Sequence, residues 1–149
     1  MEFDGGDWID CGKSFLNKGN WTIIIRVAAN STQGGFMGQY SSRAIGRYVL
    51  CIERGEFKRF ISSNRGNGYL AIGEVQQNKW SEIAISKAED TTMYSYNNGG
   101  VVDSIKSFDQ VPLQVNMKIG GVNGFKGAVD EVMIWDRALS PDELKLACN

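Results

Sequence analysis

The chain has 149 residues, of which 42% are hydrophobic and 22% charged, as in one ordinary globular domain. Its 16 basic and 17 acidic residues give a net charge of −1, which offers no reason to expect nucleic acid as a partner. Histidine is absent, and this excludes a Ser-His-Asp triad and every histidine-ligated metal site. Three cysteines are too few for a disulfide scaffold.

Short strands separated by glycine-rich turns are predicted along the first half of the chain. Residues 1–4 are strand-like, and residues 21–27 alternate between apolar and other side chains, as a half-buried strand does. Residues 47–60 are predicted to form a hairpin. No apolar run is long enough to cross a bilayer, and the start of the chain is not a secretion signal. The chain is therefore either made without a signal or a module of a larger protein.

The second half repeats the pattern and ends in one helix. Residues 80–86 form a strand, and Asn98-Gly99 between two apolar runs is a strong hairpin signal. Further strands are expected at 118–120 and 128–135. The segment 140–143 combines an N-cap serine, a proline at the first helical position and a glutamate three residues on, so a short terminal helix begins there. Many strands with almost no helix predict a sandwich or a barrel.

Three segments resemble the laminin-G-like family of the concanavalin-A-like jelly rolls. The first is FDGGDWIDCG (3–12) with WTIIIRV (21–27), and the second is NKWSEIAIS (78–86) with MYSYNNGGVVDS (93–104). The third, IGGVNGFKGAVDEVMIWDRALSPDEL (119–144), is the longest and most specific. The resemblance implies an all-β fold over the whole chain: a single two-sheet antiparallel jelly-roll sandwich with one short C-terminal helix.

Catalysis is not expected. The jelly-roll glucanases that share this architecture carry two glutamates and an aspartate at alternating positions on one strand face, since retaining hydrolysis needs two carboxyl groups ~5–5.5 Å apart. No such triplet occurs here. Glu53 and Glu56 flank a turn, and Asp142 and Glu143 begin the helix. We therefore expect a protein that is not a glycosidase or any other enzyme.

The resemblance also implies a structural calcium ion. In many related jelly rolls such an ion joins the first strand to an aspartate of the last one, and the matching residues here are Asp4 and Asp130. Calcium prefers clustered carboxylate and carbonyl oxygens. The alternative is that both carboxylates accept hydrogen bonds from backbone amides.

Sugar-binding sites combine an aromatic face with a few planar polar groups. Tyrosines beside arginine or asparagine in glycine- and serine-rich loops, and polar or aromatic strand positions on the concave sheet, fit this description. These candidates are Tyr40 with Arg43, Tyr69 with Arg65 and Asn67, and the strand residues Arg26 and Tyr94. Each one is alternatively an aromatic or polar residue of the core or rim.

Residues 43–65 hold six basic and two acidic residues, a local charge of +4. The stretch either meets acidic glycans or proteins, or is a solvated hairpin whose cations prevent edge pairing, which we favour. Cys51 lies in an apolar strand and is expected to be a buried hydrophobe. Because jelly rolls often bring their chain ends together, a disulfide between Cys11 and Cys148 stays an open alternative.

The function expected from these features is recognition. The first hypothesis is a non-catalytic adhesion module that binds a cell-surface glycan or glycoprotein through its loops and concave sheet. The second is a structural virion protein, such as a capsid decoration or tail component, that docks on neighbouring virion subunits. Either protein acts outside the cell, at a cell surface or on a virion surface, without inserting into a membrane.

Overall fold

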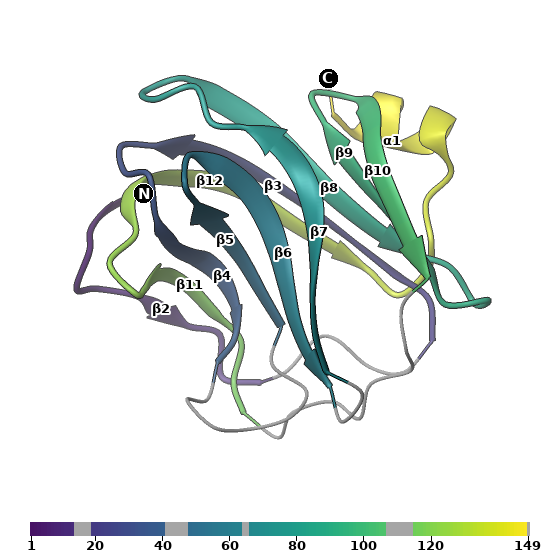
Figure 1. The fold of residues 1–149 in the computed structure, drawn as a ribbon, viewed down its shortest axis with the longest axis horizontal. Helices are drawn as coiled ribbons and strands as arrows, with labels where there is room; N and C mark the ends of the chain where they lie inside the picture. The colour runs from purple at the N-terminus through teal and green to yellow at the C-terminus, as the bar shows by residue number, and fades with distance from the viewer. Residues whose placement is uncertain (14–18, 41–47, 64–65, 107–114, 149) are drawn as a thin grey trace.

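The computed structural model describes residues 1–13, 19–40, 48–63, 66–106 and 115–148, and they form two packed six-stranded antiparallel sheets (Figure 1). In spatial order, sheet A consists of β1 (Glu2–Asp4), β12 (Lys126–Trp135), β3 (Trp21–Ala29), β8 (Trp80–Lys87), β9 (Thr92–Asn97) and β10 (Gly100–Lys106). Sheet B consists of β2 (Ile9–Asp10), β11 (Lys118–Val122), β4 (Gly34–Gln39), β5 (Tyr48–Glu53), β6 (Glu56–Ser63) and β7 (Gly66–Glu74). Helix α1 spans Pro141–Ala147. The predicted all-β sandwich with a short C-terminal helix is confirmed.

The two predicted hairpins are confirmed together with their turns. Arg54 and Gly55 join β5 to β6 with φ values of 55° and 80°, and Asn98 and Gly99 join β9 to β10 with values of 48° and 76°. Two successive positive φ angles are typical of the two-residue turns that match the twist of a hairpin. The β9–β10 hairpin runs further than its sequence suggests, to Lys106.

Three strands were not predicted: β2, β4 and β7. Strands β4 and β7 begin at Gly34 and Gly66, and glycine-rich segments such as these are typical of loops. Both segments become strands because a neighbour offers its backbone hydrogen bonds, β5 and β11 to β4 and β6 to β7. The placement of Tyr69 in a loop is therefore wrong, because this residue lies within β7.

The main core lies between the two sheets. Ile23, Ile25 and Val27 point inward from β3 and are fully buried, as their alternation predicts. Four phenylalanines connect the sheets, with neighbouring ring centroids 5.7 to 6.2 Å apart: Phe3, Phe125, Phe36 and Phe57. These rings pack edge-on or tilted, which is the arrangement that aromatic quadrupoles favour.

A second, smaller core lies on the outer face of sheet A, where α1 packs. Ile24 of β3 and Ala84 of β8 point outward and contact Leu139 and Leu144 of the C-terminal segment. All four side chains are buried. Helix α1, the only helix among the described residues, is too short and too polar to cross a membrane.

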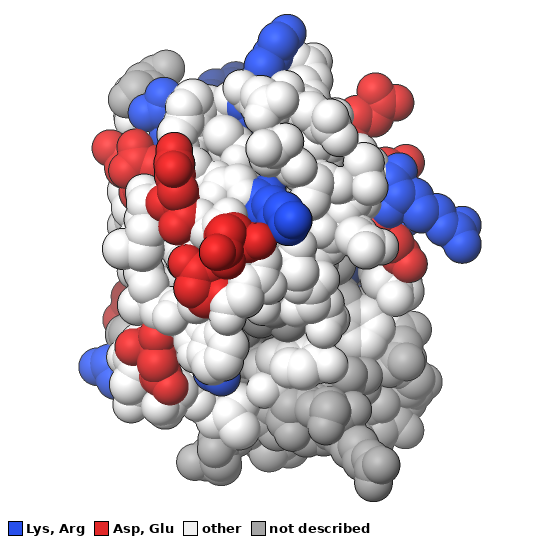
Figure 2. All heavy atoms as spheres, turned by 90° about the vertical axis from the view of Figure 1, so that its left-hand side faces the viewer, with Lys and Arg blue, Asp and Glu red and all other residues white. Residues whose placement is uncertain are grey.

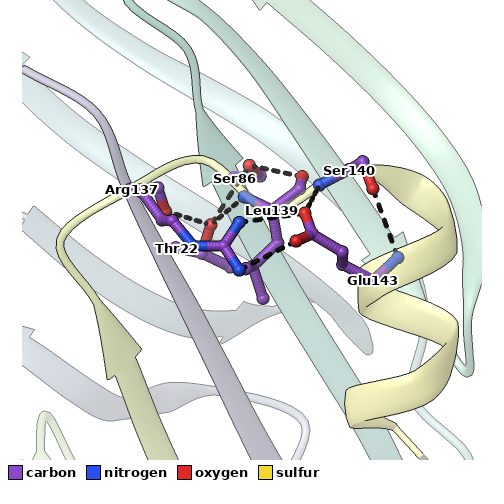
Figure 3. Close-up of polar contacts among 6 residues, drawn as sticks. All are labelled: Thr22, Ser86, Arg137, Leu139, Ser140 and Glu143. Carbon is purple, nitrogen blue, oxygen red and sulfur yellow. Dashed lines mark hydrogen bonds and ion pairs between the residues drawn. The ribbon is translucent and has the colours of Figure 1, made fainter.

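Buried hydroxyl groups fasten the C-terminal segment to sheet A (Figure 3). The Thr22 hydroxyl donates to the Arg137 carbonyl and accepts from the Leu139 N–H, each over 2.9 Å. The Ser86 hydroxyl donates to the Leu139 carbonyl over 3.3 Å. Because Thr22 and Ser86 point outward from two adjacent strands, they hold the chain just before α1 against the sheet.

The predicted capping box then begins the helix (Figure 3). The Glu143 N–H donates to the Ser140 hydroxyl over 3.3 Å, and the Ser140 N–H donates to the Glu143 carboxylate over 2.8 Å. The Arg137 guanidinium lies 2.8 Å from the same carboxylate. This hydrogen bond from Arg137, with that from Ser140, lowers the pKa of Glu143 to about 2.

The basic stretch is not an edge hairpin, so that part of the prediction is wrong. Strands β5 and β6 lie inside sheet B, flanked by β4 and β7. Lys58 pairs with Glu56 at 3.0 Å and Glu53 at 3.6 Å, and Arg59 is buried. The pairing with Glu56 raises the pKa of Lys58. Three bases of the stretch, Arg43, Arg47 and Arg65, have side chains outside the described residues.

The three cysteines are free thiols, so the alternative of a Cys11–Cys148 disulfide is wrong. Cys11 packs against the core between the sheets, whereas Cys148 packs against the small core under α1. Sheet A separates these two environments. Cys51 is half-buried in β5, and burial raises the pKa of its thiol to about 11.

Candidate functional site

The outer face of sheet B carries a hollow of about 400 Å³. Cross-strand register brings its central side chains together, because Val49, Phe60 and Tyr69 face one another across β5, β6 and β7. Cys51 lies two residues further along β5, and Tyr40 comes directly after β4. These five residues form the apolar and aromatic part of what we call the sheet B hollow.

The aromatic rings of the hollow are arranged as a tilted pair. The Phe60 and Tyr69 ring centroids lie 5.2 Å apart with an angle of 57° between the planes. Tyr69 remains 50% exposed, although it lies in the interior of a strand. The Lys58 ammonium lies 6.0 Å from the centroid of the Tyr69 ring. An aromatic ring that is exposed and fixed in its orientation is a surface on which the apolar face of a ligand can stack.

Polar groups surround this aromatic surface. The lining also includes Gln33 and Asn123, which carry side-chain amides, and Glu53, which carries a carboxylate. Glu53 is also bound to the Lys58 ammonium, so its negative charge is partly compensated. Amide and carboxylate groups accept and donate the hydrogen bonds that polar ligands offer, and they fix a ligand's orientation above the rings.

The chemistry of the hollow favours binding over catalysis. Its thiol, Cys51, has a raised pKa, so at neutral pH it is a protonated, weak nucleophile. Glu53 is the one carboxylate among its described lining residues, whereas glycoside hydrolysis uses two. Its aromatic surface and the amide-bearing residues around it can hold a polar ligand.

The structure brings together two of the predicted ligand residues and separates others. Tyr40 and Tyr69 line the same hollow, although they come from different parts of the chain. Arg26 and Tyr94 point outward from sheet A, on the opposite side of the sandwich. Tyr94 shares this face with the small core under α1, since Tyr96, two residues on, belongs to that core.

Of the remaining predicted residues, two lie outside the described residues and the third is described by its backbone alone. Arg43 and Arg65 fall outside the described residues, and Asn67 is placed in β7 without a described side chain. In the backbone register Asn67 pairs with Ser62 of β6, and Tyr69 pairs with Phe60 two positions further along.

The two aspartates predicted to bind calcium do not meet. Asp4 faces Lys126 in the β1–β12 register, four positions before Asp130, which is a separation of roughly 13 Å along the strand. One calcium ion, with ligands at about 2.3–2.6 Å, does not bridge such a gap. Asp4 accepts a hydrogen bond from the Gly6 N–H, and Asp130 lies 3.9 Å from Arg26. The presence of a structural calcium ion in this protein stays a prediction.

Several lining residues of the hollow were not predicted. Phe60 is the clearest case: it lies three positions after the buried Phe57, so strand alternation puts it on the opposite face, outward with Lys58. That signal was present in the sequence. Gln33 and Asn123 gave no such signal, because they belong to turns that only the folded chain brings beside the hollow.

The chain matches one family model, described as the concanavalin A-like lectin/glucanases superfamily, over residues 3–145. No curated protein sequence matches it. Its fold resembles the receptor binding domain of botulinum neurotoxin D, with a TM-score of 0.76 and 17% identity over 99% of this chain. It also resembles the NanB sialidase from Streptococcus pneumoniae, with a TM-score of 0.77 and 16% identity over 94% of this chain.

A third similar structure is that of the botulinum neurotoxin serotype D ligand binding domain in complex with N-acetylneuraminic acid. Its TM-score is 0.76, with 17% identity over 99% of this chain. The chain spans 41% of that domain, 42% of the neurotoxin D receptor binding domain and 26% of the sialidase. At these identities the likeness shows the shared fold.

Proposed function

We propose that this chain, which belongs to the concanavalin A-like lectin/glucanase superfamily, is a non-catalytic module that binds a glycan through the sheet B hollow. The observation that carries the proposal is the meeting of Tyr40 and Tyr69 with Phe60 in one open hollow. Sugar rings have an apolar face that stacks on aromatic side chains and hydroxyl groups that bind amides and carboxylates.

The order of the site supports binding at low entropic cost. Tyr69 is held on one side by Phe60 and by the backbone pairing of β6 with β7, so its ring is oriented before a ligand arrives. A ring that is already oriented loses little conformational freedom on binding. The neurotoxin D domain with bound N-acetylneuraminic acid supports the ligand class at the level of the fold, while the residues named here define the site.

We also propose where this domain acts and which molecules it meets. Cell-surface glycans and glycoproteins lie outside the cell, so a glycan-binding module of this kind acts there. Adhesion, in this view, is the attachment of a larger assembly to a glycan-coated surface through this domain. Recognition needs shape and hydrogen bonds at the hollow, and it needs no reaction.

A glycan array with purified protein tests the proposal. We expect saturable binding by the wild-type chain and a loss of at least about 10-fold in affinity for Tyr69→Ala, equivalent to ~1.4 kcal/mol. Tyr94→Ala is the matched control, because Tyr94 is also an exposed strand tyrosine but lies on sheet A. We expect that variant to bind as the wild type does.

Running the array with calcium and with chelator tests the predicted ion separately. Equal binding in both conditions would show that glycan recognition needs no calcium ion. A wild-type array that is blank in both conditions overturns the proposal, as does a Tyr69→Ala variant that keeps full affinity. A blank array would also direct attention to the alternative prediction, a scaffold that docks on virion subunits.

A further inference from the structure

The outer face of sheet A carries two further hollows, one on each side of the Trp80 indole. Their volumes are about 490 and 360 Å³, and Trp80 lines both. The first hollow extends from Trp80 over Ala28 and Ala128 toward Glu2, and the second extends over Arg26 toward Glu82. We call these two hollows together the Trp80 groove. It lies on the face opposite the sheet B hollow and beside the part of the sheet that α1 covers.

Register explains why the groove exists. Glu2, Ala128, Ala28 and Trp80 face one another in a row across β1, β12, β3 and β8. Two small side chains in the middle of the row leave a low floor between Glu2 and the indole. Three strand spacings of ~4.8 Å make the row roughly 14 Å long. The groove is therefore elongated, and it suits a chain-like ligand.

The Trp80 indole is exposed and held in place. It is 45% exposed. The Arg26 guanidinium lies 5.2 Å from the centroid of the indole ring, and its Nη1 atom lies 3.9 Å from the Asp130 carboxylate. Arg26 and Asp130 face each other across β3 and β12, in the row next to Trp80. Together they orient the indole and leave it open to the groove.

One acceptor in the groove lacks a donor. Glu82 lines the second hollow, and its Oε1 atom is buried without a hydrogen-bond partner among the described residues. Its backbone groups are paired, since the Glu82 N–H donates to the Asn98 side chain and the Asn98 N–H donates to the Glu82 carbonyl. A buried acceptor without a donor costs free energy. The carboxylate also accepts a hydrogen bond from the Cys148 thiol. Because the Oε1 atom is closed to solvent, the acceptors that a ligand reaches in the groove are its exposed carboxylates.

A bulge adds acceptors to the same wall. The β12 register shifts between Asp130 and Val132, and Glu131 at this point has a φ of 46°. The extra residue lets Asp130 and Glu131 both lie on the exposed face, and Glu131 lines the second hollow. A left-handed glutamate is costly in a strand, and such strain is often found at binding sites.

The charge of the groove selects among ligands. Four acidic residues line it, Glu2, Asp4, Glu82 and Glu131, against the cations Arg26 and Lys126. Figure 2 faces the side on which the N-terminal strands lie and shows acidic side chains gathered there. An anionic sugar is repelled by this excess of carboxylates. A cationic peptide meets the Arg26 guanidinium already placed over the indole.

We propose that the Trp80 groove binds a neutral oligosaccharide chain. One sugar ring stacks on the Trp80 indole, and the hydroxyl groups of that ring and its neighbours donate to the exposed carboxylates of Glu131 and Glu2. This site is separate from the sheet B hollow, so the domain has two glycan-binding faces. Such a module would connect two glycan chains, or two segments of one chain, through opposite sides of the sandwich.

The test uses the NMR signals of the indole N–H groups. The chain has four tryptophans, and Trp80→Phe assigns the Trp80 signal by its disappearance. The probes are four neutral hexasaccharides, namely cellohexaose, maltohexaose, mannohexaose and chitohexaose. We expect at least one of them to shift the Trp80 signal in a saturable way, with an affinity that falls at least 10-fold in Trp80→Ala.

Two controls make the result specific. Trp8 is exposed and also has a cation above its ring, with the Lys118 ammonium 4.4 Å from the centroid, but it lies outside the groove. Trp8→Ala is expected to keep the affinity. Ala28→Leu, which raises the floor without removing the indole, is expected to reduce it. The other indole signals report whether each variant is folded.

The outcomes also separate this site from the proposed function. Tyr69→Ala is expected to leave the Trp80 titration unchanged, so either site can fail while the other stands. The proposal is overturned if no hexasaccharide shifts the Trp80 signal. It is also overturned if Trp80→Ala binds normally, or if hexalysine shifts the Trp80 signal more strongly than every hexasaccharide does.

Discussion

The two outer faces of the sandwich are covered differently. On sheet A, α1 and the segment before it cover part of the face with a second apolar core around Leu139 and Leu144. On sheet B, no helix among the described residues lies over the face, and Tyr69 remains half exposed. A strand residue that points outward is therefore structural where α1 covers it and accessible to ligands where it does not. Sheet A shows both situations on one face, because the Trp80 groove lies beside the part that α1 covers.

The largest expected effect on stability comes from weakening the packing of α1 on the outer face of sheet A. Leu144 is fully buried under α1, whereas Leu146, two residues on, is 78% exposed. We expect Leu144→Ala to reduce the free energy of unfolding by about 2–5 kcal/mol through lost burial and a cavity. Leu146→Ala, the same change in the same helix, should alter it by less than about 0.5 kcal/mol. Chemical denaturation measures both, and equal losses would show that α1 does not pack as described.

A smaller loss is expected from the hydroxyl that fastens the segment before α1. Thr22→Val preserves shape but leaves the buried Leu139 N–H without an acceptor, which costs about 1–3 kcal/mol. Thr32→Val, at an exposed position, is the control. Hydrogen exchange should show faster opening of α1 in the Thr22 variant. An unchanged exchange rate would contradict the role given to Thr22.

The next prediction concerns the pH dependence of the stability that Glu143 gives to the start of α1. The pKa of Glu143 is lowered to about 2 from an ordinary value of 4.5, because Arg137 and the Ser140 N–H bind its charged form. The stabilisation is therefore complete above pH 4.5 and is lost as the pH falls toward 2. Unfolding measured between pH 5 and pH 2 should be less pH-dependent in Glu143→Gln than in the wild type. Asp142→Asn removes another carboxylate from the same helical turn. It tests whether the loss of any nearby negative charge reduces the pH dependence in the same way.

The smallest expected effect is a change in the reaction rate of one thiol, Cys51 on sheet B, relative to another, Cys148 on sheet A. Burial raises the pKa of Cys51 to about 11 and that of Cys148 to about 12, so both should react slowly with a thiol reagent at pH 8. Cys51 lines the sheet B hollow, and Cys148 packs under α1. A glycan identified by the array should slow the labelling of Cys51 further and leave Cys148 unchanged. Equal protection of both thiols would place that glycan elsewhere.

Local patterns were sufficient for several parts of this protein. The alternation of residues 21–27 identified β3 and its buried face, and Asn98-Gly99 identified a hairpin. The segment 140–143 identified the start of α1, including its capping box. Each of these features depends on residues that are close in the chain, so their spacing alone carries the information.

Glycine-rich segments were where local patterns failed. Strands β4 and β7 have little intrinsic preference for an extended conformation, and they form because adjacent strands pair with them. Tyr69 therefore became a residue of an ordered strand, and it faces Phe60 in the hollow. The sequence predicted Tyr69 as a candidate ligand residue but not the strand or the surface to which it belongs.

By itself, the sequence determined the fold class, the superfamily resemblance, the absence of histidine chemistry and the alternation of side chains on the strands that it predicted. Only the tertiary structure decided which outward-facing side chains of different strands become neighbours. It brought Tyr40 to Tyr69, placed Arg26 beside Trp80, and set Asp4 and Asp130 apart. The reason is that alternation fixes the two faces of one strand, whereas the order and register of strands far apart in the chain fix which residues meet across a sheet.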